Sequence, residues 1–147
     1  SFFNEEMNRL ERGKLRPVSA IFIDMNGLKA INDEFGHDVG DDLLRRMGNI
    51  LSRAIIKSSY TASRIGGDEF VILMPGADDL TVESVVMSIE ELLNIDNQYY
   101  ASQPINIAMG YASSFEQETI DNMLKRADQA MYLKKRSYYA YIAEKAE

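Results

Sequence analysis

Two short segments of this chain are apolar at nearly every position, and they constrain the possible folds more than any other feature. Residues 18–23 (VSAIFI) and 70–74 (FVILM) are short and contain β-branched residues. Such runs are typical of strands that are buried on both faces of a sheet. We therefore expect both segments to lie at the centre of one sheet.

The remaining segments alternate between helical and strand patterns. Helical spacing covers residues 2–10, 43–54, 82–93 and 120–131, whereas residues 60–65 and 105–111 have strand character. We expect a polar, glycine-containing loop after residue 24 and a short final strand over residues 139–142. The order predicts an α+β fold with a ferredoxin-like βαββαβ, palm-type core, in which helices flank a mostly antiparallel sheet.

The predicted topology brings three acidic residues together. In a ferredoxin-like sheet the first and third strands are antiparallel neighbours, so the end of the first lies beside the start of the third. Asp24 follows the first strand, and Asp68 and Glu69 precede the third. We expect these three side chains to meet at one edge of the sheet.

Length and charge narrow the class of protein. The chain has 147 residues, which suits a single domain over residues 1–147, and its first residues already have a helical pattern. We expect a piece of a longer, multidomain protein. A net charge of -7 argues against nucleic-acid partners and against membrane contact by this segment. The absence of cysteine fits a reducing compartment. We expect a cytoplasmic location, with membrane anchoring of the full-length protein left open.

Clustered carboxylates repel one another, and a fold keeps them together chiefly where a cation is bound. Oxygen ligands without His or Cys favour Mg²⁺ or Mn²⁺. Gly66 and Gly67, beside Asp68, allow the backbone to approach a phosphate closely. Together these features indicate phosphoryl or nucleotidyl transfer. The alternative from the turn alone is an ordinary Gly-Gly hairpin with exposed acids.

Three sequence blocks resemble one known family. RIGGDEF (residues 64–70), IDMNGLKAINDEFGHDVGDDLL (residues 23–44) and ADQAMYLKK (residues 127–135) are similar to the motifs of GGDEF-type diguanylate cyclases. The resemblance implies condensation of two GTP into cyclic di-GMP, with release of two pyrophosphates. It also implies a homodimer and Mg²⁺ or Mn²⁺, two ions per active site.

The resemblance assigns roles to the acidic residues. Asp24 matches a metal ligand, and the backbone carbonyl of Met25 matches a second one. Asp68 matches the acidic metal ligand that is often assigned as the base for the 3′-hydroxyl proton. Glu69 matches the adjacent essential acid, close to the metals. Asp68 and Glu69 are therefore the expected catalytic residues.

Five further positions match contacts to phosphate. Gly66 and Gly67 would line the phosphate and ribose, and the backbone amides of Gly27 and Leu28 would cap the triphosphate. Lys135 matches a lysine that contacts the triphosphate, a role that ammonium groups often fill. An alternative for Lys135 is favourable placement at a helix C-terminus.

Asn32 and Asp41 match the pair that recognises guanine. A carboxylate accepts hydrogen bonds from the N1–H and N2–H₂ groups of guanine, which adenine lacks, so we expect selectivity for GTP. An alternative places Asp41 in the first turn of a helix that Asp38 or a neighbour caps. His37 matches a substrate contact, with a packed loop histidine as its alternative.

The chain departs from the family pattern at three places. Tyr139 stands where many relatives carry an arginine that binds phosphate, and a phenol cannot replace a guanidinium. Lys57 and Tyr60 replace the arginine and aspartate of the product-inhibition site, so we expect that site to be absent. The Leu-Thr-Gly motif that precedes the first helix in the family is missing.

Two rival functions remain open. One is a catalytically weak or inactive GGDEF domain that serves as a GTP-binding sensor or a scaffold, which the departure at Tyr139 leaves possible. The other is a different palm-type nucleotidyl transferase, such as an adenylyl cyclase or a polymerase. Asn32 and Asp41 favour guanine, and the acidic composition offers no duplex-binding stripe.

Overall fold

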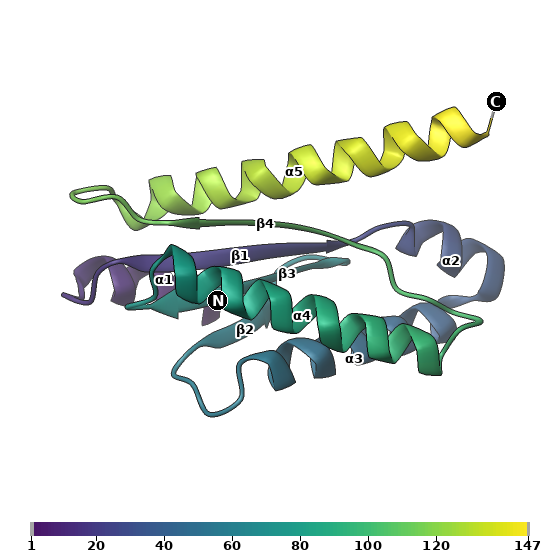
Figure 1. Ribbon diagram of the computed structural model, residues 1–147, viewed down its shortest axis with the longest axis horizontal. Helices are drawn as coiled ribbons and strands as arrows, with labels where there is room; N and C mark the ends of the chain where they lie inside the picture. The colour runs from purple at the N-terminus through teal and green to yellow at the C-terminus, as the bar shows by residue number, and fades with distance from the viewer. Residues whose placement is uncertain (1, 147) are drawn as a thin grey trace.

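A computed structural model describes residues 2–146 (Figure 1). The elements follow in the order α1 (Phe2–Arg12), β1 (Val18–Met25), α2 (Leu28–Phe35), α3 (His37–Ala54), β2 (Thr61–Arg64), β3 (Glu69–Pro75), α4 (Asp79–Tyr99), β4 (Ile107–Ser113) and α5 (Ile120–Lys145). The four strands form one antiparallel sheet in the order β2-β3-β1-β4. The predicted α+β fold is confirmed, with the ferredoxin-like strand order.

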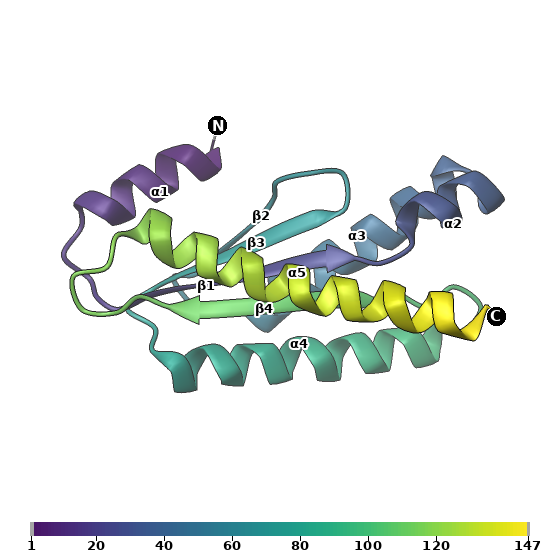
Figure 2. The same cartoon turned by 90° about the horizontal axis from the view of Figure 1, so that it is seen from above.

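The two apolar segments lie at the centre of the sheet, as predicted. Every residue of β1 is buried, because helices cover both of its faces. Ile21, Ile23 and Met25 face a core that includes side chains of α3 and α4. The alternate residues, such as Ala20 and Phe22, face a second core formed with α1 and α5. Figures 1 and 2 show α5 lying along one face of the sheet and α4 along the other.

The expected loop after residue 24 is wrong, because residues 28–35 form α2. The sequence signal is weak at both ends of this helix. Gly27 precedes it with a φ of 73° and no side-chain cap, and Gly36 follows it with a φ of 93°. Leu28 is buried and Ile31 packs against the core, so tertiary packing holds a short helix that lacks capping residues.

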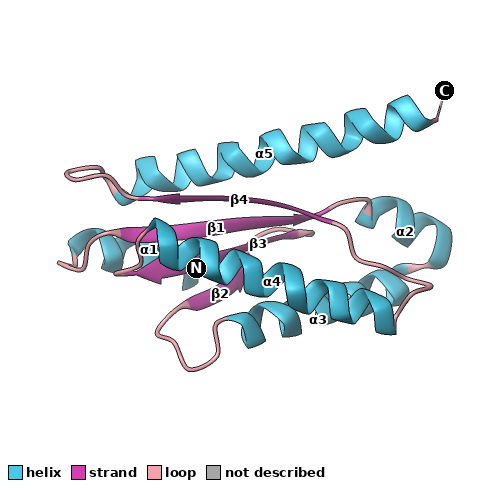
Figure 3. Ribbon diagram, in the orientation of Figure 1, coloured by secondary structure: helices cyan, strands magenta, loops and turns pink. Residues whose placement is uncertain are grey.

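The expected final strand over residues 139–142 is also wrong, because these residues belong to α5. Neither glycine nor proline occurs between residues 120 and 145, so nothing in the sequence ends the helix there. Figure 3 shows this helix continuing beyond the sheet. Among residues 2–146, no helix combines the length and the apolar character needed to cross a bilayer.

The position of α5 over the sheet depends on close contact at one glycine of β4. A Cβ atom at Gly110 would collide with backbone atoms of Ala130 and Met131 in α5. The helix therefore lies directly on the strand at this point. This contact places the next turns of α5 above the end of β1, where Asp24 lies.

Candidate active site

Asp24, Asp68 and Glu69 lie together at the end of β1, as predicted from topology. The β1–β3 register pairs Asp24 with Glu69, and the Met25 N–H donates to the Asp68 carbonyl at 2.9 Å. Side chains alternate along a strand, so Asp24 lies on the α5 face of the sheet with Phe22. The three acids line one cavity of about 410 Å³, here called the acidic cavity.

The turn before β3 is held by an arginine that the motif reading left without a role. The guanidinium of Arg64 donates to the carbonyls of Gly66 and Gly67 at 3.1 and 3.0 Å. The Ile65 N–H donates to the Glu69 carbonyl at 2.9 Å and closes the hairpin. Engagement of both glycine carbonyls by Arg64 orients this turn beside the acidic cavity.

Asp24 is the most buried acid of the site, with only 2% of its surface exposed. Its Oδ2 atom accepts a hydrogen bond from Lys135 Nζ at 3.1 Å, whereas its buried Oδ1 atom has no partner among the described residues. Burial raises the pKa of Asp24, Lys135 opposes this effect, and Asp68 and Asp128 add to it. Burial alone lowers the pKa of Lys135, but the hydrogen bond to Asp24 and the nearby carboxylates raise it overall.

A fourth carboxylate, Asp128, belongs to the acidic cavity and was missed by sequence reasoning. Burial raises the pKa of Glu69, and repulsion from Asp128 is the next largest cause, ahead of Asp24 and Asp68. Asp128 precedes Lys135 by two helical turns, so both project from the same face of α5. This spacing was visible in the sequence block at residues 127–135.

The side chains of this cavity have the chemistry of a site for a hard cation. Asp24, Asp68 and Glu69 line one cavity, and within residues 2–146 the buried Oδ1 of Asp24 has no hydrogen-bond partner, although a buried oxygen requires one. Within residues 2–146, no three His, Cys, Asp or Glu side chains are arranged to hold a metal ion by themselves. Nucleotide oxygens would therefore have to complete the coordination.

The predicted triphosphate loop lies at the start of α2. The Gly27 N–H donates to the hydroxyl of Tyr139 at 3.1 Å, and Leu28 turns its side chain into the core. Among the described residues, no side chain caps α2 at its N-cap, so the backbone amides that follow Gly27 are available to an acceptor. Lys135, one helical turn before Tyr139, bonds to Asp24, which precedes this loop in the chain.

The predicted guanine residues lie on α2 and α3. The side chain of Asn32 packs against Gly40, which is buried and adjacent to Asp41, and the buried Asn32 Oδ1 has no partner among the described residues. Asp41 and His37 are exposed. The capping alternative for Asp41 is wrong: Gly36 is the N-cap of α3, no side chain caps it, and Asp38 is the acid of its first turn.

Gly40→Ala is expected to weaken GTP binding while the domain stays folded. A Cβ at this position would overlap the side-chain amide of Asn32 and displace it. We expect a loss of about tenfold in affinity, which corresponds to about one hydrogen bond. Gly48→Ala is the matched control, because nothing lies within 4 Å of a Cβ there, in the same helix. Calorimetric titration of both variants with GTP measures the two affinities. Equal affinities would contradict the predicted role of Asn32.

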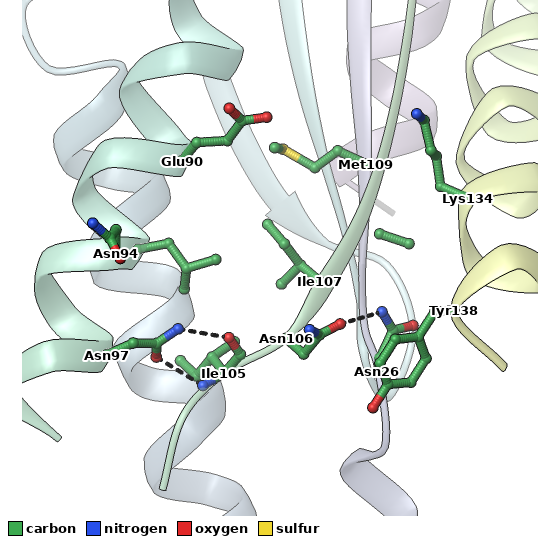
Figure 4. Close-up of a pocket in the computed structure, with 12 residues that line it drawn as sticks. Asn26, Glu90, Asn94, Asn97, Ile105, Asn106, Ile107, Met109, Lys134 and Tyr138 are labelled. Atoms are coloured by element: carbon green, nitrogen blue, oxygen red, sulfur yellow. Dashed lines mark hydrogen bonds between the residues drawn. The ribbon is translucent and has the colours of Figure 1, made fainter. Parts of the chain in front are cut away.

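A second cavity, of about 520 Å³, lies between α4, β4 and α5 (Figure 4). Lys134 and Tyr138 line it, together with Asn26, Asn106 and Glu90. Of the residues that the structure describes, those lining this cavity include none of the predicted site residues. Lys134 and Tyr138 thus line one cavity, whereas their neighbours Lys135 and Tyr139 bond to Asp24 and Gly27.

Comparisons with known proteins identify the family. The model described as "Diguanylate cyclase, GGDEF domain" matches residues 1–139. The chain is 30% identical over 122 residues to "Diguanylate cyclase DgcS" of Shewanella oneidensis, covering 82% of this chain and 40% of DgcS. It is 35% identical over 144 residues to "Response regulator PleD" of Caulobacter vibrioides, covering 88% of this chain and 30% of PleD.

Solved structures agree. An EAL/GGDEF domain protein from M. capsulatus superposes with a TM-score of 0.70 at 32% identity, covering 93% of this chain and 92% of that one. The chain spans less than half of the length of DgcS and of PleD, so it corresponds to one part of each relative. The match to the family model over residues 1–139, together with these relatives, shows that this chain belongs to the GGDEF domain family of diguanylate cyclases.

Proposed function

We propose that this domain condenses two GTP molecules into cyclic di-GMP and releases two pyrophosphates. The observation that carries the proposal is the acidic cavity. Asp24, Asp68 and Glu69 line it beside the diglycine turn, and the buried Oδ1 of Asp24 has no partner among the described residues. Family membership and relatives named diguanylate cyclase support the same activity.

Each chain would hold one GTP in a half-site. Asp24, Asp68, Glu69 and the Met25 carbonyl would hold Mg²⁺ or Mn²⁺, two ions per site. When bound, the ions neutralise phosphate charge and lower the pKa of the attacking hydroxyl. Lys135 pairs with Asp24, and its ammonium would bind the triphosphate once that carboxylate holds a cation. Gly66 and Gly67 would line the phosphate and ribose.

The reaction consists of two successive displacements at an α-phosphorus atom. The 3′-oxygen of one GTP forms a bond to the α-phosphorus of the other, and the bond from that phosphorus to the bridging oxygen breaks. The leaving pyrophosphate takes the bonding electrons, and the 3′-hydroxyl proton passes to Asp68, next to Glu69. A repeat with the roles of the nucleotides exchanged closes the ring. Two half-sites must face each other, so a homodimer is part of the proposal.

Guanine selectivity would come from Asn32 and Asp41. The Asp41 carboxylate can accept from two guanine donors, and the unpartnered Asn32 oxygen offers another acceptor. Exposed His37, at the start of α3, is a further candidate contact.

A cytoplasmic location and additional domains in the full-length protein remain predictions.

Incubation of the purified domain with GTP and Mg²⁺ or Mn²⁺, followed by mass analysis of the nucleotides, tests the function. We expect cyclic di-GMP and the linear intermediate pppGpG, with a rate per chain that rises with protein concentration when dimers are scarce. Bound but unconverted GTP would instead support the rival function, a GTP-binding sensor or scaffold. The contact of Tyr139 with Gly27 is the observation that favours this rival.

Tyr139→Arg is expected to raise the affinity for GTP about tenfold, because a guanidinium forms charge-assisted hydrogen bonds to phosphate and a phenol does not. Position 139 lies one turn beyond Lys135, and its side chain bonds to Gly27, in the proposed triphosphate loop. Titration of a GTP analogue with a non-cleavable α,β-methylene bridge measures the change. An affinity of Tyr139→Arg equal to that of the wild type would contradict the proposal that residue 139 faces the phosphates.

Product inhibition at the usual family position is expected to be absent. Lys57 is exposed and Tyr60 offers no carboxylate, so a bidentate grip on guanine is lost. Cyclic di-GMP titrated against the Asp68→Asn protein should show no binding that depends on residue 57. Tight binding that Lys57→Ala abolishes would refute this prediction.

A further inference from the structure

Tyr139 makes a contact that the family motifs do not anticipate. Its hydroxyl accepts the hydrogen bond of the Gly27 N–H at 3.1 Å and so joins the C-terminal half of α5 to the start of α2. The Gly27 N–H is one of the amides at the start of α2 that have no acceptor within the helix, and the phenol oxygen satisfies it. Tyr139 is 44% exposed, so its ring has room to turn into solvent.

The contact lies within the proposed nucleotide site. Lys135, one turn earlier on α5, bonds at 3.1 Å to Asp24, three residues before Gly27. The same face of α5 therefore reaches both the acidic cavity and the amide of Gly27. The adjacent Tyr138 lines the second cavity instead.

We propose that Tyr139 competes with the triphosphate for the amide of Gly27 and thereby sets the affinity of this domain for GTP. The inference rests on the proposed function. One N–H group makes one good hydrogen bond, so a phosphate oxygen can take this donor only after the phenol has left it. The apparent affinity then equals the intrinsic affinity multiplied by the fraction of chains in which the ring has turned away.

Tyr139→Phe tests the competition, because it removes the hydroxyl and keeps the ring. We expect the affinity for the α,β-methylene analogue of GTP, measured in Mg²⁺, to rise about threefold to tenfold, the range of one ordinary hydrogen bond. Tyr138→Phe is the matched control and should leave the affinity unchanged. In the absence of nucleotide, the Gly27 amide should also exchange its hydrogen faster in Tyr139→Phe than in the wild type.

The outcomes separate this inference from the proposed function. Binding by the wild type with no gain in Tyr139→Phe overturns the competition and leaves the function standing. Weaker binding by Tyr139→Phe also overturns it, because the hydroxyl would then be a phosphate ligand. No nucleotide binding by any of the three proteins overturns the proposed function and the competition with it.

Discussion

Asp24→Asn is expected to lower the rate of cyclic di-GMP formation about a thousandfold, while the domain stays at least as stable as the wild type at pH 7. The rate falls because a neutral amide cannot hold a divalent cation as a carboxylate does. Several kcal/mol of transition-state stabilisation correspond to a loss of this size. Stability is kept because the charged form of Asp24 is buried and one of its oxygens is unsatisfied.

The raised pKa of Asp24 determines how the stability difference between Asp24→Asn and the wild type changes with pH. The pKa of folded Asp24 is raised above its usual 3.8, so protonation favours the folded state. The stability that Asp24 contributes is complete below 3.8 and is lost as pH rises through the raised pKa. The free energy of unfolding of Asp24→Asn, relative to the wild type, should therefore increase across this window. Denaturant titrations of both proteins at pH 3 to 7 measure this difference. A variant that loses stability relative to the wild type as pH rises would contradict the burial argument.

Gly110→Ala is expected to lower the free energy of unfolding by about 3 kcal/mol, a large part of the stability of an ordinary domain. The added methyl group would meet backbone of α5, at Ala130 and Met131, which cannot yield by a change of rotamer. The helix must move off β4, and Lys135 must then move with it. Weaker GTP binding should accompany the lost stability.

Gly48→Ala provides the matched control for Gly110→Ala. A Cβ at residue 48 has no neighbour within 4 Å, and the position is inside α3. Alanine there should stabilise the domain by about 0.5–1 kcal/mol. Chemical denaturation of both variants gives the comparison. Similar stabilities would show that α5 does not rest on β4 as closely as described.

The sheet and the acidic cavity could be predicted because they depend on signals that the sequence carries strongly. Two continuously apolar segments identify the central strands, and strand order then brings Asp24 opposite Glu69. Asp128 was missed although it lies two turns before Lys135. Its acidic partners are on other elements, and only the packing of α5 on β4 brings them together.

The two errors in secondary structure have different physical origins: tertiary packing overrides a weak local signal at α2, whereas α5 simply continues as an uninterrupted helix. Helix α2 lacks capping residues and is held by the burial of Leu28. The strand expected over residues 139–142 is absent because no glycine or proline interrupts α5 before this segment. The bond between Tyr139 and Gly27 joins residues 112 positions apart, and only the continued helix makes it possible.

The central claim is that the carboxylates around Asp24 bind the nucleotide through a divalent cation. Its most direct test is calorimetric titration of the α,β-methylene analogue of GTP into wild type and Asp24→Asn, once with Mg²⁺ and once with EDTA. The proposed site predicts that EDTA weakens binding by the wild type at least about tenfold and barely changes the already weak binding of Asp24→Asn. Equal affinity of the wild type with and without Mg²⁺ would contradict it.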